Sequence, residues 1–301
     1  MAKRNSHTLE TLRSDLRLLG VKAGYDLIVH TSLRSLGEVI GGYRNFLEAL
    51  LAVIGPESTI VVPAFYYGNI DPAGHSIPPP ESELEEYRAR CRPFSPMLTQ
   101  SQEGSFGEMV RLDRRGFRSL HPIISFAAIG RRAKEYTVNH KPDDADGIDS
   151  PIGRIYQRAK GQILLVGVDH IKNTSLHLAE SLAGCPHYQR ANLRYKIDNN
   201  SWGELKGIGG CSGGFHKIRG LIDFQKYEIS GRVGDARTIL VEQKRFVDAV
   251  RDALVETPWA LLCENPHCRD CTIAREIYGL PTLLEREYHL RSPLPHPDLD
   301  D

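Results

Sequence analysis

Residues 161–180, Gly-Gln-Ile-Leu-Leu-Val-Gly-Val-Asp-His-Ile-Lys-Asn-Thr-Ser-Leu-His-Leu-Ala-Glu, form the segment that decides the fold of this chain. The continuous apolar run from Ile163 to Val168 predicts a buried strand. A short polar turn follows, and Asn173 or Thr174 is a suitable N-cap for a helix. A buried strand that leads through a turn into a helix is typical of open α/β sheets. Such sheets bind ligands beyond the carboxyl ends of their strands.

The same segment carries two histidines and a glutamate. His170 lies in the turn, and His177 and Glu180 are three residues apart, so they share one face of the predicted helix. Imidazole and carboxylate groups together transfer protons near neutral pH. These residues alone leave open a proton-transfer site, a metal site or an exposed polar helix face. The segment lacks the His-Glu-x-x-His order of zinc proteases, and the chain lacks the Gly-x-Ser-x-Gly elbow of serine hydrolases.

The rest of the chain alternates between helical and strand patterns. Apolar runs predict further strands at 26–30, 59–65 and 123–129. Amphipathic spacing predicts helices at 46–54, 104–112 and 241–255. We therefore expect an α/β fold with a central, mostly parallel mixed sheet flanked by helices. The simplest organisation is one domain over residues 1–260, with a long loop insertion at 66–103 and a cysteine-containing C-terminal extension at 261–301.

The charge balance limits the classes of partner. Lys plus Arg and Asp plus Glu each number 38 in 301 residues, so the net charge is zero. A protein held to nucleic acid by phosphate contacts needs a basic excess. No apolar run approaches the roughly 18 residues of a membrane helix, and the N-terminus lacks the apolar region of a signal peptide. We expect a soluble cytoplasmic protein that binds neither nucleic acid nor membranes.

Three of the six cysteines cluster near the C-terminus, in the pattern Cys263-x4-Cys268-x2-Cys271. Six cysteines in 301 residues are too few for a disulfide scaffold. Thiols packed in a loop are the simpler interpretation. The alternative is a structural zinc site made of Cys263, His267, Cys268 and Cys271.

Two further stretches carry polar residues at predicted element ends. In Val29-His-Thr-Ser-Leu-Arg-Ser-Leu-Gly37, hydroxyls, backbone N–H groups and an arginine follow a strand. They suit either an anionic phosphate group or an ordinary helix cap with a solvated arginine. The stretch is not a P-loop, because it lacks Gly-Lys-Ser/Thr. Ser150-Pro151 predicts a helix start, at which Ser150 and Arg154 would line a ligand groove or serve the helix alone.

The order of five sequence blocks is more specific than any one of them. The blocks are Val29–Gly37, Val61–Phe65, Arg118–Gly130, Asp149–Tyr156 and Gly161–Glu180. In this order they resemble the aminoglycoside 3-N-acetyltransferase family, also called the antibiotic N-acetyltransferase family. The resemblance covers about residues 8–255 and implies a fold distinct from that of the GNAT acetyltransferases.

The resemblance implies acetyl transfer from acetyl-CoA to an amine of an aminoglycoside-like antibiotic or a related small amine, as in antibiotic resistance. It implies no metal in catalysis. By position, His170 would be the general base and Glu180 the carboxylate that orients it. Residues near the reacting groups would be His30, Asp169, Asn173 and His177. Residues that contact coenzyme A would be Thr31, Ser32, Leu33, Arg34, Ser35, Ser150 and Arg154.

The identity of the acceptor is less determined than the reaction. An enzyme for polycationic aminoglycosides is expected to have an acidic cleft, whereas this chain is neutral. Acidic residues do cluster at 81–86 and 143–149, where they would be able to line a cleft. Two other functions are considered: a non-catalytic or regulatory protein with a zinc-stapled C-terminus, and a metal-dependent hydrolase using His170, His177 and Glu180. A homodimer is considered as the assembly.

Overall fold

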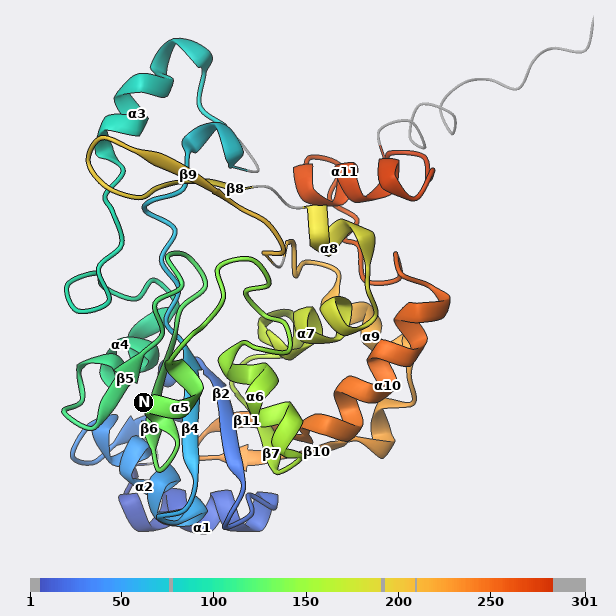
Figure 1. Cartoon of the computed structure of the whole chain (residues 1–301). Helices are drawn as coiled ribbons and strands as arrows, with labels where there is room; N and C mark the ends of the chain where they lie inside the picture. Colours follow the sequence, from blue (N-terminus) through green and yellow to red (C-terminus); the bar gives the residue numbers. More distant parts are fainter. Residues whose placement is uncertain (1–5, 76–77, 191–192, 209, 284–301) are drawn as a thin grey trace, which may run out of the picture.

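The structure, a computed structural model, describes residues 6–75, 78–190, 193–208 and 210–283. Its centre is a seven-stranded mixed sheet with the strand order β10-β11-β7-β2-β4-β6-β5 (Figure 1). The strands of this sheet are β2 (Asp26–Thr31), β4 (Thr59–Pro63), β5 (Gly116–Arg118), β6 (Phe126–Gly130), β7 (Gly161–Val166), β10 (Glu228–Val233) and β11 (Ala236–Glu242).

Within this sheet, the parallel pairs join the three central strands. β2 is parallel to β7 on one side and to β4 on the other. β11 and β10 add antiparallel strands beyond β7, and β6 and β5 add them beyond β4. The predicted mixed sheet is therefore confirmed, with its parallel part limited to β7, β2 and β4. Because these three strands run the same way, their carboxyl ends meet at one edge.

Helices cover both faces of the sheet. One face carries α1 (Leu9–Leu19), α2 (Arg44–Ile54) and α4 (Gly104–Leu112). The other carries α5 (Ala133–Thr137), α6 (Pro151–Arg158), α7 (Ser175–Leu182) and α10 (Gln243–Glu256). Side chains of β2 alternate between the two layers, since Leu27 and Val29 belong to the first core and Ile28 to the second. Burying each such side chain contributes about 2 kcal/mol.

A buried carboxyl group joins the layers at the start of β2. Asp26 is fully buried and accepts hydrogen bonds from the Thr59 backbone N–H (2.7 Å), the Tyr136 hydroxyl (2.6 Å) and the Arg158 guanidinium (3.0 Å). Burial raises the pKa of Asp26 despite these partners. The contacts fix β4, α5 and α6 relative to the central strand.

Two predicted boundaries are corrected. Val241 pairs with Ile163 in β11, so the helix predicted from 241 begins at Gln243. The strand predicted from 123 begins at Phe126, because the backbone N–H groups of Ile123 and Ile124 donate to Nδ1 of the buried His121 instead of to a neighbouring strand.

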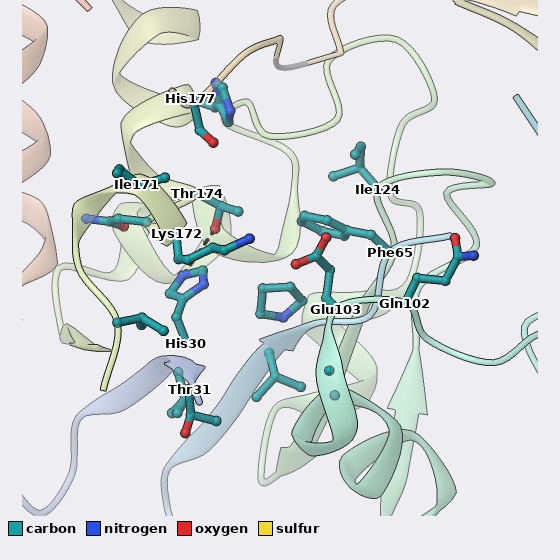
Figure 2. A pocket seen from close by; sticks show the side chains of 18 of the residues that line it. His30, Thr31, Phe65, Gln102, Glu103, Ile124, Ile171, Lys172, Thr174 and His177 are labelled. Carbon is teal, nitrogen blue, oxygen red and sulfur yellow. Dashed lines mark hydrogen bonds between the residues drawn. The ribbon is translucent and has the colours of Figure 1, made fainter. Parts of the chain in front are cut away.

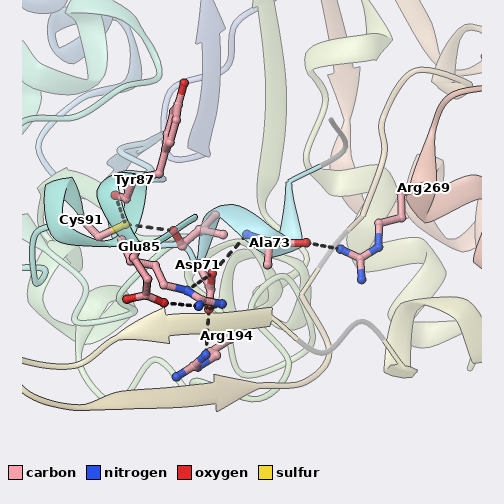
Figure 3. A network of polar contacts seen from close by, with 9 residues as sticks. Asp71, Ala73, Glu85, Tyr87, Cys91, Arg194 and Arg269 are labelled. Carbon is pink, nitrogen blue, oxygen red and sulfur yellow. Dashed lines mark hydrogen bonds and ion pairs between the residues drawn. The ribbon is translucent and has the colours of Figure 1, made fainter. Parts of the chain in front are cut away.

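The insertion predicted as a loop at 66–103 contains helix α3 (Leu84–Arg90) and two 3-10 turns. It lies beside the hairpin of β8 (Leu193–Lys196) and β9 (Trp202–Leu205) (Figure 1). Asp71 links them, since it accepts hydrogen bonds from Arg88 of α3 (3.0 Å) and Arg194 of β8 (3.0 Å) (Figure 3).

The remaining elements are a small two-stranded sheet and three short helices. They are β1 (Ser6–His7), β3 (Glu38–Val39), α8 (Pro186–Arg190), α9 (Ile218–Leu221) and α11 (Arg269–Ile277). Residues 284–301 of the predicted extension lie outside the described residues. In the part of the chain that the structure describes, no helix is long and apolar enough to cross a membrane.

Candidate active site

A cavity of about 500 Å³ lies at the edge where the three parallel strands end. Its wall includes Thr31 at the end of β2, Ser32 just after it, Pro63 at the end of β4, and Val168 after β7. This volume is within the range of small-molecule sites. Figure 2 shows side chains from these strand ends, from the 66–103 insertion and from α7 around the same space. The edge of the sheet that was predicted to bind ligands therefore borders a cavity.

The turn after β7 is built by short-range contacts. Gly167 has a φ of +64°, and a Cβ there would lie 1.8 Å from the Ser35 Oγ, so only glycine fits. Asp169 Oδ1 accepts from the Ile171 N–H (3.0 Å), and Asn173 Oδ1 accepts from the Ser175 N–H (3.1 Å) at the start of α7. These contacts direct the N-terminal half of α7 toward the cavity.

His177 of α7 lines the cavity, and its partner is Glu180. Its Nδ1 lies 2.7 Å from Glu180 Oε2, and the pair is almost completely buried. Because a carboxylate only accepts, Nδ1 donates, which leaves the lone pair on Nε2. Within the described residues, that Nε2 has no hydrogen-bond partner. The arrangement suits a general base, with the carboxylate fixing the tautomer of the imidazole.

His177 and Glu180 shift each other's pKa values in opposite directions. Burial lowers the pKa of His177, but the hydrogen bond and charge of Glu180 outweigh it, so this pKa is raised above its ordinary value. Burial raises the pKa of Glu180, but the hydrogen bonds from His177 and His187 outweigh it and hold this pKa at about 2. Glu180 is therefore ionised at neutral pH, and His177 is a stronger base than an isolated histidine.

A second histidine holds the other oxygen of Glu180. His187 Nε2 lies 3.2 Å from Glu180 Oε1, and its Nδ1 lies 2.6 Å from the Tyr278 hydroxyl. Since the carboxylate only accepts, Nε2 of His187 donates to it and Nδ1 accepts from Tyr278. Both oxygens of Glu180 are thus fixed, and the chain of contacts ends next to α11.

The predicted pairing of His170 with Glu180 is wrong. His170 Nε2 lies 2.7 Å from Glu228 Oε1, and its Nδ1 lies 3.1 Å from Asn173 Nδ2. Nε2 therefore donates to the carboxylate and Nδ1 accepts from the amide, so both ring nitrogens are occupied. The ring is buried, stacks on Phe246 with a centroid separation of 5.2 Å, and does not line the cavity. His170 supports the turn, and His177 is the histidine that pairs with Glu180 and lines the cavity.

Two other residues predicted to lie near the reacting groups do line the cavity, namely His30 and Asn173. His30 Nε2 lies 3.4 Å from the Thr174 hydroxyl. Burial, together with the nearby Lys172 and His170, lowers the pKa of His30 to about 3, so this ring is neutral. The fourth predicted residue, Asp169, caps the turn as described above and does not line the cavity.

The stretch predicted to contact coenzyme A divides into two groups. Thr31 and Ser32 line the cavity, and Arg34 is exposed and has no ion-pair partner among the described residues. Leu33 is buried in the core, and the Ser35 hydroxyl donates to the Ser32 carbonyl (2.6 Å). Leu33 and Ser35 therefore shape the turn, and their side chains are not free to contact a ligand.

The ligand groove predicted at Ser150 and Arg154 is not part of this cavity. Ser150 is buried, and its Oγ accepts from the Gly153 N–H (3.1 Å) as the N-cap of α6. Arg154 donates to backbone carbonyls within α5 and just beyond it, among them those of Glu135 (2.6 Å) and Asn139 (3.2 Å). Both side chains serve the helix start, which is the alternative that the sequence left open.

Several residues of the cavity wall were not predicted. They are Phe65, Tyr67, Gln102, Glu103, Ile124, Asp146 and Lys172. The Tyr67 hydroxyl donates to Glu103 Oε1 (2.8 Å), so the two ends of the 66–103 insertion meet at the wall. Of the predicted acidic clusters, 143–149 contributes Asp146 and 81–86 contributes nothing to the wall. Phe65, Ile124 and Lys172 lie in sequence blocks that were recognised, but no role was assigned to them, and no motif marks Tyr67, Gln102 or Glu103.

Metal-ligand geometry is found elsewhere in the described residues. Four side chains of the described residues are close enough together to hold a metal ion, namely those of Cys211, Cys263, Cys268 and Cys271. His170, His177 and Glu180 do not form such a group there. The metal-dependent hydrolase is therefore not supported. His267, which the sequence suggested as the fourth ligand, is not in the group, and its place is taken by Cys211.

Comparisons with known proteins agree with this geometry. A family model described as aminoglycoside 3-N-acetyltransferase matches residues 28–255. The SPbeta prophage-derived aminoglycoside N(3')-acetyltransferase-like protein YokD of Bacillus subtilis is 34% identical over 248 residues, which are 80% of this chain and 90% of that protein. Aminoglycoside N(3)-acetyltransferase VIII of Streptomyces fradiae is 33% identical over 57% of this chain and 60% of its own length.

Solved structures are similar over most of the chain. A variant of aminoglycoside acetyltransferase AAC(3)-IVa in complex with a gentamicin has a TM-score of 0.76 and 26% identity, over 92% of this chain and 99% of that one. The family model, the relatives and the fold lead to the same conclusion. The chain belongs to the aminoglycoside 3-N-acetyltransferase family.

Proposed function

We propose that this protein is an N-acetyltransferase that moves the acetyl group of acetyl-CoA to an amine of an aminoglycoside, with His177 as general base. The observation that carries the proposal is the pair of His177 and Glu180 in the cavity wall. The pair leaves one imidazole nitrogen free toward the cavity. The family membership supports the reaction, and the geometry supports the choice of base.

Acetyl-CoA supplies a thioester, which an amine attacks only through its unprotonated nitrogen lone pair. His177 Nε2 accepts the proton of the attacking amine as the C–N bond forms. Glu180 stabilises the imidazolium that results, because its carboxylate is ionised and bonded to Nδ1. The C–S bond then breaks, and the coenzyme A sulfur leaves as thiolate and takes up a proton.

The cavity has features that suit a cationic acceptor. Glu103 and Asp146 both line it, and in Figure 2 Glu103 lies on the side of the insertion while Lys172 lies on the opposite side beside His30. Carboxyl groups in a partly enclosed cavity attract ammonium groups. The related AAC(3)-IVa variant holds a gentamicin, which supports an aminoglycoside as the acceptor.

The turn after β2 is the proposed contact for coenzyme A. Thr31 and Ser32 line the cavity, and the exposed Arg34 lies just beyond them. An unpaired guanidinium is suited to a phosphate group. In this arrangement the thioester reaches His177 from the side of β2, and the acceptor enters from the side of the insertion.

The test is a thiol-release assay on the purified chain with acetyl-CoA. The acceptors are gentamicin, sisomicin and simple monoamines, and mass spectrometry measures the gain of one acetyl group. We expect saturable release with an aminoglycoside and little with the monoamines. The absence of release with every aminoglycoside tested would remove the proposal.

A further inference from the structure

Four cysteines from separate parts of the chain meet outside the cavity. Cys211 follows β9, Cys263 follows α10, and Cys268 and Cys271 flank the start of α11. Their sulfur atoms all lie within 4.8 Å of one another, and all four thiols are unpaired. A tetrahedral zinc ion with Zn–S bonds of about 2.3 Å separates its sulfurs by about 3.8 Å. The cluster is therefore close to the geometry of a four-thiolate zinc site.

Backbone donors point to the sulfurs. The N–H of Gly213 donates to Cys211 Sγ (3.2 Å), and the N–H of Cys263 donates to Cys271 Sγ (3.2 Å). Such N–H···S contacts orient and stabilise thiolate ligands. The loop also packs closely on the segment after α10, since a Cβ at Gly214 would lie 2.1 Å from the Leu261 carbonyl oxygen.

A buried cation lies beside the cluster. Arg275 is 6% exposed, and its guanidinium donates to the carbonyls of Cys271 (3.2 Å) and Cys263 (2.6 Å). In the described part of the chain it forms no ion pair with a carboxylate. A buried guanidinium is costly without a negative charge nearby. A zinc ion with four thiolates carries a net negative charge and supplies it.

The local core is too small to hold this region by itself. Leu262, Ala274 and three of the cysteines form a cluster separate from the two main cores. Small units of this kind are commonly stabilised by a metal ion or by disulfides. Four sulfurs that are all close together favour a metal over two separate disulfide pairs.

We propose that Cys211, Cys263, Cys268 and Cys271 bind one zinc ion as four thiolates, and that this ion fixes the loop at 210–215 to α11. The site has no open coordination position, so its role is structural. The Cys-x2-Cys spacing of Cys268 and Cys271 supplies two ligands from one helix start. Cys211 supplies the ligand that joins the loop at 210–215 to the start of α11.

Two chains of contacts connect the zinc site to His177 and Glu180. The effect of zinc on catalysis that follows from them rests on the proposed function. Gly210 and Ser212, on either side of Cys211, line the cavity, and the Phe215 ring lies 4.7 Å from that of His177. On the other route, Tyr278 follows α11 and holds His187, which holds Glu180. Loss of the ion would therefore loosen both the cavity wall and the support of Glu180.

Metal analysis of the purified full-length chain tests the site without reference to activity. We expect about one zinc ion per chain and, after cobalt substitution, the visible absorption bands of a tetrahedral thiolate site. Cys211→Ser should retain less than about one fifth of the zinc after dialysis against a chelator. Cys91→Ser, the same change at a buried cysteine outside the cluster, should retain all of it, as should His267→Ala.

Three results would overturn the proposal. They are a chain that binds no zinc or cobalt while its thiols are reduced, a chain that holds iron with sulfide, and zinc that survives in Cys211→Ser but is lost in His267→Ala. If Cys211→Ser does not fold, the cobalt spectrum of the unaltered chain decides the question. Zinc binding without acetyl transfer would remove the proposed function and leave the zinc site standing.

Discussion

His170 and His177 lie in one turn-and-helix segment, yet their rings have opposite surroundings. His170 has Glu228 on one nitrogen and Asn173 on the other, whereas His177 has Glu180 on one nitrogen and the cavity on the other. The sequence identified both histidines as candidates. It did not identify their partners, because Glu228 comes from β10 and meets His170 only through the folded sheet.

The pH dependence of the reaction reports on His177 at the residue scale. Only the unprotonated imidazole accepts a proton, so kcat/KM is expected to fall as the pH drops through the raised pKa of His177. Glu180→Gln removes the carboxylate that raises this pKa, while burial still lowers it. The midpoint of the profile should therefore move to lower pH, and the maximal rate should fall.

Glu228→Gln is the matched control for this profile, because its carboxylate contacts His170 instead. Its midpoint should equal that of the unaltered enzyme. All of the profiles are measured with the same acceptor, so the titration of its amine affects each of them equally. An unchanged midpoint in Glu180→Gln would show that Glu180 does not set the pKa of the catalytic base.

Arg34 makes a residue-scale prediction about coenzyme A. Because its guanidinium is exposed and has no ion-pair partner in the described residues, Arg34→Ala should fold normally. The KM for acetyl-CoA should rise about tenfold, with little change in kcat, as expected for a lost phosphate contact. Arg17→Ala, at an exposed arginine on α1, is the control. Equal KM values in the two variants would place coenzyme A elsewhere.

At the scale of elements, the predictable parts are those decided by local pattern. Continuous apolar runs identified β2, β4 and β7, which are buried on both faces. Ser150 is the N-cap of α6, as predicted, whereas Asn173 lies one residue before the N-cap Thr174 of α7 and accepts from the Ser175 N–H. The β10–β11 hairpin was missed, because β10 is largely exposed at the edge of the sheet and lacks an apolar run.

The turn after β7 gives a prediction at the element scale. Gly167→Ala introduces a positive φ for alanine and a clash with Ser35 Oγ. Gly24→Ala introduces a positive φ with no atom within 4 Å. Both should lower the free energy of unfolding, Gly24→Ala by about 1 kcal/mol and Gly167→Ala by about 2–4 kcal/mol. Urea denaturation measures the difference, and equal losses would contradict the close approach of the turn.

At the scale of the whole molecule, buried neutral histidines set the response to acid. Burial lowers the pKa of His121 to about 4 and those of His30 and His140 to about 3. In the unfolded chain these groups take up protons below about pH 6.5, and in the folded chain they do not. Acidification therefore favours the unfolded state from pH 6.5 down to the folded pKa values.

Each of these histidines should cost about 1.4 kcal/mol per pH unit in that window, or about 4 kcal/mol for the three between pH 6 and pH 5. Urea denaturation at the two pH values measures the loss. His140→Gln should reduce the slope by about one third, and His216→Gln, at an exposed histidine, should leave it unchanged. A flat stability between pH 6 and pH 5 would contradict the buried neutral state.

The arrangement of distant segments is what the sequence predicted least. Cys211 lies in the glycine-rich stretch 207–214, far along the chain from the cysteines at 263–271 that it meets in the fold. Glu103 and Tyr67 reach the cavity from the two ends of the insertion. Such contacts depend on tertiary packing, so local pattern identified the strand edge where the cavity lies but only part of its wall.

The central claim is that His177, not His170, is the base of an acetyl transfer to an aminoglycoside amine. Its most direct test is single-turnover acetyl transfer to gentamicin, with saturating acetyl-CoA, by His177→Gln and His170→Gln. A glutamine amide is able to donate to the neighbouring carboxylate in both variants, so the two changes are matched. We predict that His177→Gln is slowed at least about a hundredfold and His170→Gln less than about tenfold. The reverse order would contradict the account.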